Sequence, residues 1–518
     1  MGKNGKVVPY ILVMLEAALL VVFEWDVLYE IQEQNLFLHS TLFFKQSMVR
    51  SGGLLTWAGA YLTQFFYYPW LGACLLGLLW VLLMWLIKSA FRLSSAWPAL
   101  VPVTCLLLTI VTQGYWVYYM KLPGHAFVPT VGAIVVTMMV WGYRGLLSSS
   151  SVSSILYILI SAVVGYPFFG FYALLAVALM GIMACMTGTH RLAVCITVVA
   201  AIVAVPLVYY YMVYHETNIV NIYWTAIPVF AMGEEHFFAY YLPYIALAVS
   251  MGVMSGSSLI NCHLSPLVSR ISLFALLALC LAVFWYKDDN FHRELAMSHS
   301  IEKQDWEHVL AKARGVKGEP TRSICMMQNL ALFRLGRPAE EMLPSNGRGG
   351  AGTQGVVNGS KRPDAPFPVR MVHTCGKMLY LQYGVPNYCY RWCMEDGVKY
   401  GWSVAGLKLM AKCHLLNGET VAAQRLLNML KKTDFHRSWA LRFETILHSP
   451  HLVPHDRELG PILPLLRADN FLTADQSQLE MFLIEHILST LGGTPEQQEL
   501  ARRTALYYRH NRQKLVEP

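Results

Sequence analysis

The first 286 residues of this chain carry very few charged side chains. Charged residues make up 14% of the 518-residue sequence, whereas a soluble domain carries about 25%. In residues 1–286 the charged share is about 6%, and in residues 287–518 it is about 23%, an ordinary soluble value. This imbalance excludes a soluble enzyme, a fibrous chain and a disordered chain. It predicts a membrane-embedded region followed by a soluble one.

The chain also lacks the short patterns of several functional classes. No Walker loop, dinucleotide fingerprint, HExxH or GxSxG pattern is present, which argues against an NTPase, a zincin and a serine hydrolase. The net charge of +8 is divided between membrane loops and a tail of mixed sign, so we expect no nucleic-acid partner. Of the eight Asp and Glu residues within residues 1–286, only Glu16 lies inside a predicted span, and the span interiors hold almost no ionisable groups, which argues against an ion-coupled transporter.

Long apolar runs predict membrane-spanning helices, each of which needs roughly 20 apolar residues. The first run is followed by Phe23-Glu24-Trp25-Asp26 and by no small-residue cleavage site, so we expect an uncleaved span. The predicted fold class is all-α, a polytopic helical bundle followed by a soluble helical domain. About nine spans are expected, near residues 7–25, 69–90, 98–118, 126–143, 152–169, 170–189, 191–213, 237–256 and 270–286.

The basic residues predict the orientation of residues 1–286, the predicted transmembrane domain. With the N-terminus in the cytoplasm, seven Lys or Arg residues lie inside, and only Lys45, Arg50 and Lys121 lie outside. An odd number of spans then places residues 287–518 across the membrane. We therefore expect a protein of the bacterial inner membrane, with a cytoplasmic N-terminus and a periplasmic C-terminal domain.

Two segments of the transmembrane domain are expected on its outer side. Residues 24–68 mix apolar and polar side chains at near-helical spacing, which predicts an amphipathic loop along the membrane surface. Residues 214–236 form a second outer loop. With this topology, seven of the eight Asp and Glu residues of the membrane half lie on the outer side.

Residues 287–518 are predicted to be mostly helical. Helices are expected from Asp305 to Arg314 and from Pro320 to Gly336, and an antiparallel pair is expected over 404–416 and 419–432. This pair, with small residues at the helix crossing and Gly418 at the turn, looks like a tetratricopeptide unit. The sequence thus predicts helical-hairpin repeats, with a flexible insertion over 343–368 that is rich in Gly, Ser, Asn and Pro.

The five cysteines of this region allow two interpretations. In an oxidising compartment up to two disulfides are possible, but buried small side chains are the favoured interpretation. A zinc site would need further His or Cys partners at matching spacing, and none is evident. The cysteines are Cys325, Cys375, Cys389, Cys393 and Cys413.

Several stretches carry a resemblance to an uncharacterised family of multi-pass membrane proteins from Bacteroidota-type bacteria. The stretches are Glu33–Thr41, Gly52-Gly53, Thr63–Gly72, Asp288–Phe291, Asp305-Trp306, Asn329–Leu332 and Arg391-Trp392. The resemblance covers most of the chain and implies no established activity.

The layout also resembles the GT-C glycosyltransferases, which use polyprenyl-phosphate sugars. Those proteins have a cytoplasmic N-terminus, a long first outer loop with acidic residues, a second outer loop and often a soluble helical C-terminal domain. The resemblance implies a glycosyltransferase or oligosaccharyltransferase that moves sugar from a polyprenyl-phosphate carrier in the membrane lipid to a periplasmic acceptor. The helical repeats would hold that protein or glycan acceptor.

The chemistry of such a transfer selects candidate residues in the outer loops. A carboxylate must deprotonate or orient the acceptor hydroxyl near the membrane surface, and a leaving lipid phosphate needs positive charge or a metal. Paired carboxylates suit Mg²⁺ or Mn²⁺, the one possible cofactor. The catalytic candidates are Glu24, Asp26 and Glu33; the substrate-binding candidates are Lys45, Arg50, Gln64, Lys121 and His236; and the metal candidates are Glu234 and Glu235.

Simpler interpretations exist for the same residues and for the whole chain. Glu24 and Asp26 can be solvated groups at a helix exit, and Lys45 and Arg50 can contact lipid phosphates alone. The alternative function is a membrane-anchored periplasmic scaffold for an envelope or secretion complex, since helical repeats mostly bind peptides or proteins. A cavity at the outer membrane boundary, lined by the carboxylates of residues 24–68 and open sideways to lipid, would favour the enzyme. If Glu24, Asp26 and Glu33 instead faced bulk solvent from separate sites, the catalytic assignment would fail.

Overall fold

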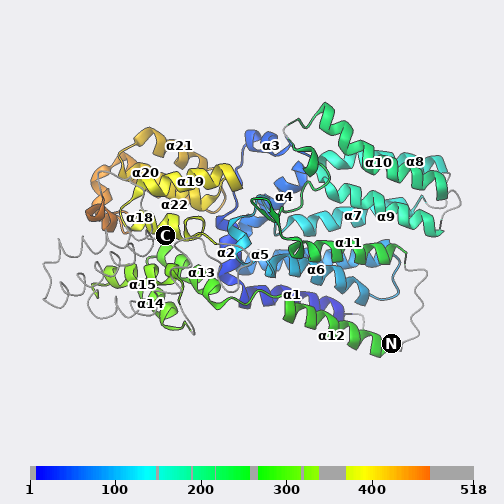
Figure 1. The fold of residues 1–518 in the computed structure, drawn as a ribbon, viewed down its shortest axis with the longest axis horizontal. Coiled ribbons are helices and arrows are strands. Elements are labelled where there is room, and N and C mark those ends of the chain that lie inside the picture. The colour runs from blue at the N-terminus through cyan, green and yellow to red at the C-terminus, as the bar shows by residue number, and fades with distance from the viewer. Residues whose placement is uncertain are drawn as a thin grey trace, which may run out of the picture. The chain divides into compact units, whose positions relative to one another are not determined.

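The computed structural model describes residues 7–146, 151–187, 191–215, 217–256, 266–316, 320–337 and 369–466. These residues are almost entirely helical, with one short two-stranded hairpin (Figure 1). The chain divides into two compact units: unit 1 comprises residues 1–116 and 120–286, and unit 2 comprises residues 117–119 and 287–518. The predicted insertion over 343–368 lies outside the described residues.

Unit 1 is built from apolar helices that run alongside one another (Figure 1). Among the described residues, five helical segments are long and apolar enough to cross a membrane, and four shorter apolar helices have 10–17 residues. The finding supports a membrane protein, whereas the count of nine spans stays a prediction. The long segments are α5 (Pro69–Ala90), α8 (Ser151–Phe169), α10 (Arg191–Met212), α11 (Leu242–Ser255) with the preceding turn η6 (Phe238–Tyr241), and α12 (Pro266–Phe284); the shorter ones are α1 (Val8–Phe23), α6 (Leu100–Val111) with η3 (Trp97–Ala99), α7 (Val128–Arg144) and α9 (Phe171–Thr187).

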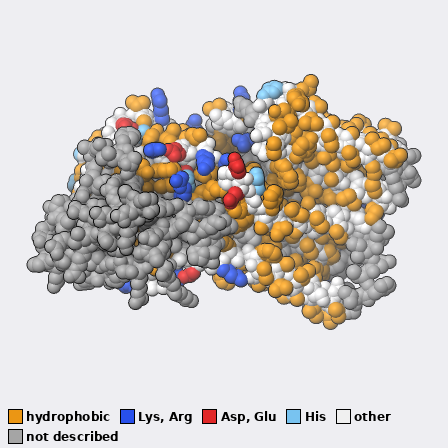
Figure 2. Space-filling view, viewed as in Figure 1, with side chains coloured by type: hydrophobic (Ala, Val, Ile, Leu, Met, Phe, Trp, Pro, Cys, Tyr) orange, Lys and Arg blue, Asp and Glu red, His pale blue; other side chains and the backbone are white. Residues whose placement is uncertain are grey.

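Small residues let these helices approach closely. A Cβ atom added at Gly77 of α5 would lie 2.9 Å from Ala17 Cβ of α1, and one at Gly132 of α7 would lie 2.5 Å from the Tyr172 ring of α9. Such contacts stabilise helix pairs that have lipid rather than water around them. In agreement, hydrophobic side chains cover much of the visible surface of unit 1 (Figure 2), and no residue of the apolar window of α12 is buried. A monomeric soluble protein rarely exposes so large an apolar surface.

The two predicted outer loops of unit 1 are folded segments. Residues 24–68, which we call the cap segment, contain the helices α2 (Trp25–Glu33), α3 (Thr41–Ser47) and α4 (Gly53–Thr63) and the turn η2 (Gln64–Tyr67). Residues 214–236 hold η5 (Ile219–Asn221) and an antiparallel hairpin that the sequence did not predict, β1 (Ala231–Met232) paired with β2 (Glu235–His236). A further turn, η4 (Gly114–Tyr118), follows α6.

Unit 2 is a series of short helices, most of which pack against their neighbours in the chain. Side-chain caps start several of them: Asp288 Oδ1 accepts from the backbone N–H groups of Asn290 and Phe291, and Asp305, Thr321 and Ser403 cap the helices that follow them. The helices at 306–314, 322–334, 404–416 and 420–430 confirm the sequence prediction. The elements are α13 (Asp289–Glu302), α14 (Trp306–Arg314), α15 (Arg322–Arg334), η8 (Met371–His373), α18 (Gly376–Gln382), α19 (Pro386–Tyr400), α20 (Val404–Leu416), α21 (Thr420–Leu430), α22 (Arg437–His448), η9 (Pro450–His455) and η10 (Gly460–Leu465).

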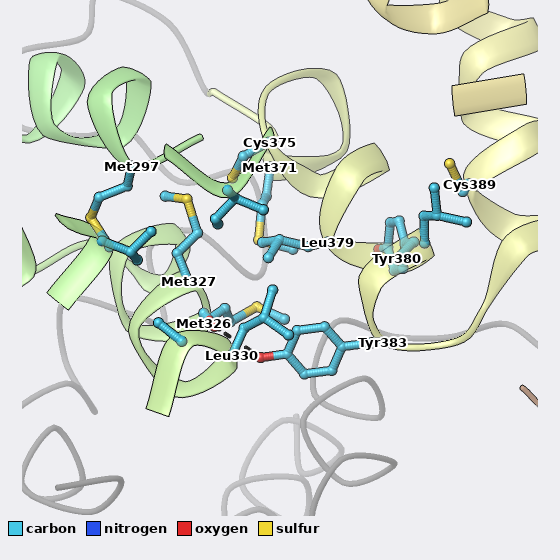
Figure 3. Packing of buried hydrophobic residues seen from close by; sticks show 14 of the residues in the cluster. Met297, Met326, Met327, Leu330, Met371, Cys375, Leu379, Tyr380, Tyr383 and Cys389 are labelled. Atoms are coloured by element: carbon cyan, nitrogen blue, oxygen red, sulfur yellow. Dashed lines mark hydrogen bonds between the residues drawn. The ribbon is translucent and has the colours of Figure 1, made fainter. Parts of the chain in front are cut away.

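The core of unit 2 is rich in sulfur-containing and aromatic side chains (Figure 3). Met326, Met327 and Leu330 of α15 pack with Leu379 of α18, and the Tyr383 hydroxyl donates a hydrogen bond to the Met326 carbonyl oxygen at 2.9 Å. The five cysteines of this unit are buried and unbridged, in agreement with the packing interpretation of these residues.

Three residues from the connection between α6 and α7 belong to unit 2 rather than to unit 1. The Tyr119 hydroxyl accepts a hydrogen bond from the Arg370 backbone N–H at 3.2 Å. The Tyr119 ring packs edge-on against His373 and Tyr400, with ring centroids 5.4 and 5.5 Å away. Residues 117–119 are therefore part of the packing of unit 2, although about 170 residues of sequence separate them from Lys287.

Candidate functional site

Helix α2 starts the cap segment directly after the first apolar helix. α1 ends at Phe23, and Glu24 connects the two helices. Val27, Leu28 and Ile31 are buried, and α2 packs against α1, α5 and η2. The apolar side of α2 thus packs against other elements of unit 1, and this packing fixes the direction of the polar side of the helix.

The polar side of α2 carries three carboxylates. Asp26, Glu30 and Glu33 stand at i, i+4 and i+7, which is nearly two helical turns and therefore one face. We call these three residues the acidic face of α2. Asp26 and Glu30 are half-buried, and Glu33 is only 2% exposed. The Gln34 side chain donates a hydrogen bond to Glu30 at 2.7 Å. Two of the three predicted catalytic residues, Asp26 and Glu33, are thus brought onto one face.

Glu24 is separate from this face. It is 3% exposed, and its Oε1 atom accepts a hydrogen bond at 2.5 Å from the indole N–H of Trp285, just after α12. The Trp285 ring also packs edge-on against Phe23 at 5.8 Å. Burial raises the pKa of Glu24 to about 8, and the Trp285 hydrogen bond opposes the rise. The carboxyl is therefore mostly protonated at neutral pH, and in this state it donates a proton more readily than it accepts one.

Asn35 ties the end of α2 to two other parts of unit 1. Its amide nitrogen donates to the Ala60 carbonyl oxygen of α4 at 2.9 Å, and its amide oxygen accepts from the Gly124 N–H at 3.1 Å. Gly124 has a φ of +70°, and a Cβ atom there would lie 2.2 Å from the Ala60 nitrogen. Only glycine permits this approach. The substrate-binding candidate Lys121, which is exposed, lies three residues from this contact.

The candidate Gln64 lies on the element against which α2 packs. It begins η2, is 5% exposed, and donates to the Tyr61 carbonyl oxygen at a long 3.4 Å. The rings of Tyr29 on α2 and Tyr67 on η2 are 6.5 Å apart. The acidic face, Gln64 and the loop around Gly124 therefore belong to one packed region of unit 1, which we take as the candidate site.

A buried hydrogen-bond chain supports the loop next to this region. His125 Nε2 donates to the Gln113 side-chain oxygen at 3.1 Å, because the Gln113 amide nitrogen already donates to the Thr109 carbonyl oxygen at 2.6 Å. Burial lowers the pKa of His125 to about 4, so its ring is neutral at pH 7. Sequence reasoning missed Asn35, Gln113 and His125. The sequence held a weak signal for them: each is a polar residue near an apolar run, and Pro123-Gly124 indicate a turn just before His125.

Helix α3 presents the basic candidates differently. No residue of α3 is buried, and Lys45 and Arg50 are exposed together with Leu42 and Phe44. A helix that exposes apolar and basic side chains together suits the boundary between acyl chains and phosphate groups.

The candidates of the second loop lie on the β1–β2 hairpin. Glu234, Glu235 and His236 are all exposed. Neighbouring residues of a strand point to opposite sides, so Glu235 and His236 do not converge. Across the part of the chain that the structure describes, no group of three or more His, Cys, Asp and Glu side chains could hold a metal ion. The predicted divalent cation therefore finds no closed ligand set here.

These features define the class as an all-helical protein with apolar helices of membrane-spanning type and a folded, carboxylate-bearing cap segment. The chain belongs to a family of unknown function (DUF6057), whose model matches residues 6–490. This confirms the resemblance to an uncharacterised family. No curated protein and no solved structure matches the chain.

Proposed function

We propose that this protein is an integral membrane transferase of the GT-C type, which moves a sugar from a polyprenyl-phosphate carrier to a protein or glycan acceptor. The observation that carries the proposal is the acidic face of α2, with Glu33 buried, directly after the first apolar helix. The donor of such a reaction is anchored in lipid, so the base that serves the acceptor hydroxyl must lie near the membrane boundary. Carboxylates of a folded segment at a helix end meet this requirement.

The three carboxylates Glu24, Asp26 and Glu33 have different roles in this proposal, because their surroundings differ. Glu33 accepts the proton of the acceptor hydroxyl, and Asp26 on the same face orients the acceptor. Glu24 positions the junction of α1 and α2 through its hydrogen bond with Trp285. Asp26 and Glu33 thus keep their predicted catalytic roles, and Glu24 takes a positioning one.

The leaving phosphate needs cationic partners, and the outer basic residues supply them. Lys45 and Arg50 lie beside the exposed apolar side chains of α3, a combination that suits a phosphate attached to a prenyl chain. Gln64 begins η2, against which α2 packs, and Lys121 lies three residues before Gly124, which is hydrogen-bonded to Asn35 at the end of α2. The exposed Glu234 and Glu235 form no ligand set with His236, so no step is assigned to a metal.

The orientation is part of the same proposal. Nine spans, a cytoplasmic N-terminus and a periplasmic unit 2 in a bacterial inner membrane place the cap segment on the side where lipid-linked sugars are consumed. The distribution of Lys and Arg, seven against three, supports it.

Unit 2 is proposed to hold the acceptor. Helices α18 to α22 each pack on the next one along the chain, as tetratricopeptide-like hairpins do.

The test compares envelope glycoconjugates in cells that lack the protein with those in complemented cells. We expect one glycan to disappear and to return with the wild type, but not with Glu33→Gln. The matched control is Glu395→Gln, which changes an exposed glutamate of unit 2 in the same way. A stably expressed Glu33→Gln variant that restores the glycan fully would overturn the proposal.

A second candidate function is the envelope scaffold, which a different observation favours. Unit 2 exposes large apolar side chains on separate helices, including Val398 at 78% and Val421 at 67%. Stacked helical hairpins bind proteins along their extended surfaces, to which these two valines can contribute apolar contacts. Unchanged glycans, together with co-purification of an envelope complex that Val421→Asp abolishes, would establish the scaffold.

A further inference from the structure

Two cysteines of unit 1 meet where α9 and α10 form a helical hairpin. Cys185 lies in the last turn of α9, and Cys195 lies one turn after the start of α10. Their sulfur atoms are 2.8 Å apart. A disulfide bond is roughly 2.05 Å long, so the two sulfurs need to move by less than an ångström to bond.

The packing of the hairpin fixes this approach. One turn deeper, a Cβ atom added at Gly181 of α9 would lie 3.0 Å from a methyl carbon of Val198 on α10. Gly181 precedes Cys185 by four residues and Val198 follows Cys195 by three, so both contacts lie on the same helix faces. The small residue at 181 brings the helices together, and the cysteines lie at the next contact along the same seam.

Both cysteines are also accessible to reagents. Each is half-buried, whereas Cys105 of the same unit is buried. Each lies within about one turn of a helix end.

We propose that Cys185 and Cys195 form a dithiol site that low-molecular-weight disulfides oxidise to an intramolecular disulfide. The thiolate of one cysteine attacks a sulfur of the small disulfide, forms a mixed disulfide and releases one small thiolate. The thiolate of the second cysteine then attacks the first cysteine, the protein S–S bond forms, and a second small thiolate leaves. Two S–H bonds of the protein are lost, and the two electrons and two protons reside in the two small thiols.

The disulfide would clamp α9 to α10. The predicted orientation places this end of unit 1 on the cytoplasmic side, where thiols are kept reduced. The modification would then report oxidative conditions. The chemistry of the pair depends neither on that orientation nor on the transferase activity.

Thiol counting on the purified full-length protein tests the proposal. The reduced protein is exposed to oxidised glutathione, denatured, and alkylated with a maleimide of known mass. Of the 11 cysteines in the chain, we expect the wild type to lose two reactive thiols and to regain them with dithiothreitol. The Cys185→Ser variant and the Cys195→Ser variant should each lose no reactive thiol through this pair. Cys74→Ser, which changes an exposed cysteine, should still lose two.

Peptide mapping locates the bond. Trypsin cleaves after Arg191, between the two cysteines, so the disulfide should join two peptides in the non-reduced digest. As a second measurement, phenylarsine oxide, which bridges two neighbouring thiols, should protect both cysteines of the wild type from alkylation. An unchanged thiol count with no arsenical protection would overturn the proposal, and so would a disulfide that links two chains.

Discussion

Unit 1 and unit 2 bury their polar side chains in different ways. Two buried groups of unit 1 have neutral partners: Glu24 accepts from Trp285, and His125 donates to Gln113. Two buried carboxylates of unit 2 instead lie between basic side chains. Asp396 accepts from His373 at 2.7 Å and from Lys377 at 2.5 Å. Glu458 is paired in the same way with Lys412 at 2.7 Å and Arg442 at 2.8 Å.

The pKa shifts follow this difference. In unit 1 burial decides: it raises the pKa of Glu24 to about 8 and lowers that of His125 to about 4, so both groups are mostly neutral. In unit 2 burial opposes the charged form, but the neighbouring cations outweigh it and lower the pKa of Asp396 and of Glu458. Burial also decides at three other groups of unit 2: it raises the pKa of Glu294, to which Thr321 donates, and lowers the pKa of His436 and of Arg334. The difference between the units therefore lies in the pairs around Asp396 and Glu458, where nearby cations keep a buried carboxylate ionised.

The largest effect should come from breaking the ion network of unit 2. Asp396→Asn removes the negative charge beside Lys377 and His373, so the buried Lys377 ammonium loses the carboxylate to which it donates. We expect a loss of about 3–5 kcal/mol in the free energy of unfolding, measured by urea denaturation of the full-length protein in detergent. Glu395→Gln next to it should leave the urea midpoint unchanged. Equal midpoints for the two variants would contradict this account of unit 2.

A smaller effect should come from a backbone contact of unit 1. Gly124→Ala and Gly233→Ala both force a left-handed backbone onto alanine, with φ values of +70° and +64°, which costs about 1–3 kcal/mol. Only Gly124→Ala adds an overlap with the Ala60 nitrogen, because nothing lies within 4 Å of a Cβ atom at Gly233.

We therefore expect Gly124→Ala to lower the thermal stability of unit 1 clearly more than Gly233→Ala. The temperature at which limited proteolysis begins to cut within residues 24–68 measures this stability. Identical digestion of the two variants would show that the Asn35–Gly124 contact does not hold the cap segment.

A fall in pH should affect the stability of the two units differently. In the unfolded chain His125 has a pKa near 6.5, whereas the folded value is about 4. The stability that this group provides is complete above pH 6.5 and is lost as the pH falls toward 4, by about 3 kcal/mol in all. The pKa of Asp396 is instead lowered from its ordinary value of 3.8, so its contribution persists until the pH falls below that value.

Urea midpoints at pH 7 and pH 4.5 test this contrast. The raised pKa of Glu24 acts in the opposite direction, because it favours folded unit 1 as the pH falls, so the contribution of His125 is taken as the difference between wild type and His125→Gln. This difference should shrink between pH 7 and pH 4.5. The contribution of the Asp396 network, taken as the difference between wild type and Asp396→Asn, should change little. A loss in unit 1 that is unaffected by His125→Gln would place the sensitivity elsewhere.

The smallest effect should come from an exposed ion pair. Arg391 and Glu395 are 2.8 Å apart on α19, with side chains 57% and 45% exposed. Water screens such a pair, so Arg391→Ala should leave the urea midpoint within experimental error. A marked shift would show that exposed charges also stabilise unit 2.

The helices were predictable from the sequence because their signals are local. Apolar runs indicated the helices of unit 1, and Asp305 and Pro320-Thr321 indicated where helices of unit 2 begin. The hairpin β1–β2 was not predictable, since two residues per strand are too few for an alternating pattern.

The candidate site was predictable only in part. The sequence indicated the carboxylates, but their grouping depends on the break between α1 and α2: because α2 starts at Trp25, Asp26 and Glu33 share a face and Glu24 does not. Asn35 could not be recognised, because its partner Gly124 is 89 residues away. Contacts of that range arise from the packing of whole helices and leave no periodic pattern in the sequence.

The place of Tyr119 in unit 2 has a consequence for how the chain is made and divided. Tyr119 is synthesised 251 residues before Arg370, to which it is bonded, so a part of unit 2 leaves the ribosome long before the rest. A gene fragment that begins at Lys287 would encode unit 2 without residues 117–119, and the rings of His373 and Tyr400 would lose a neighbour. The coding sequence of unit 1 thus holds a short part of unit 2, and unit 2 is complete only when both are translated as one polypeptide.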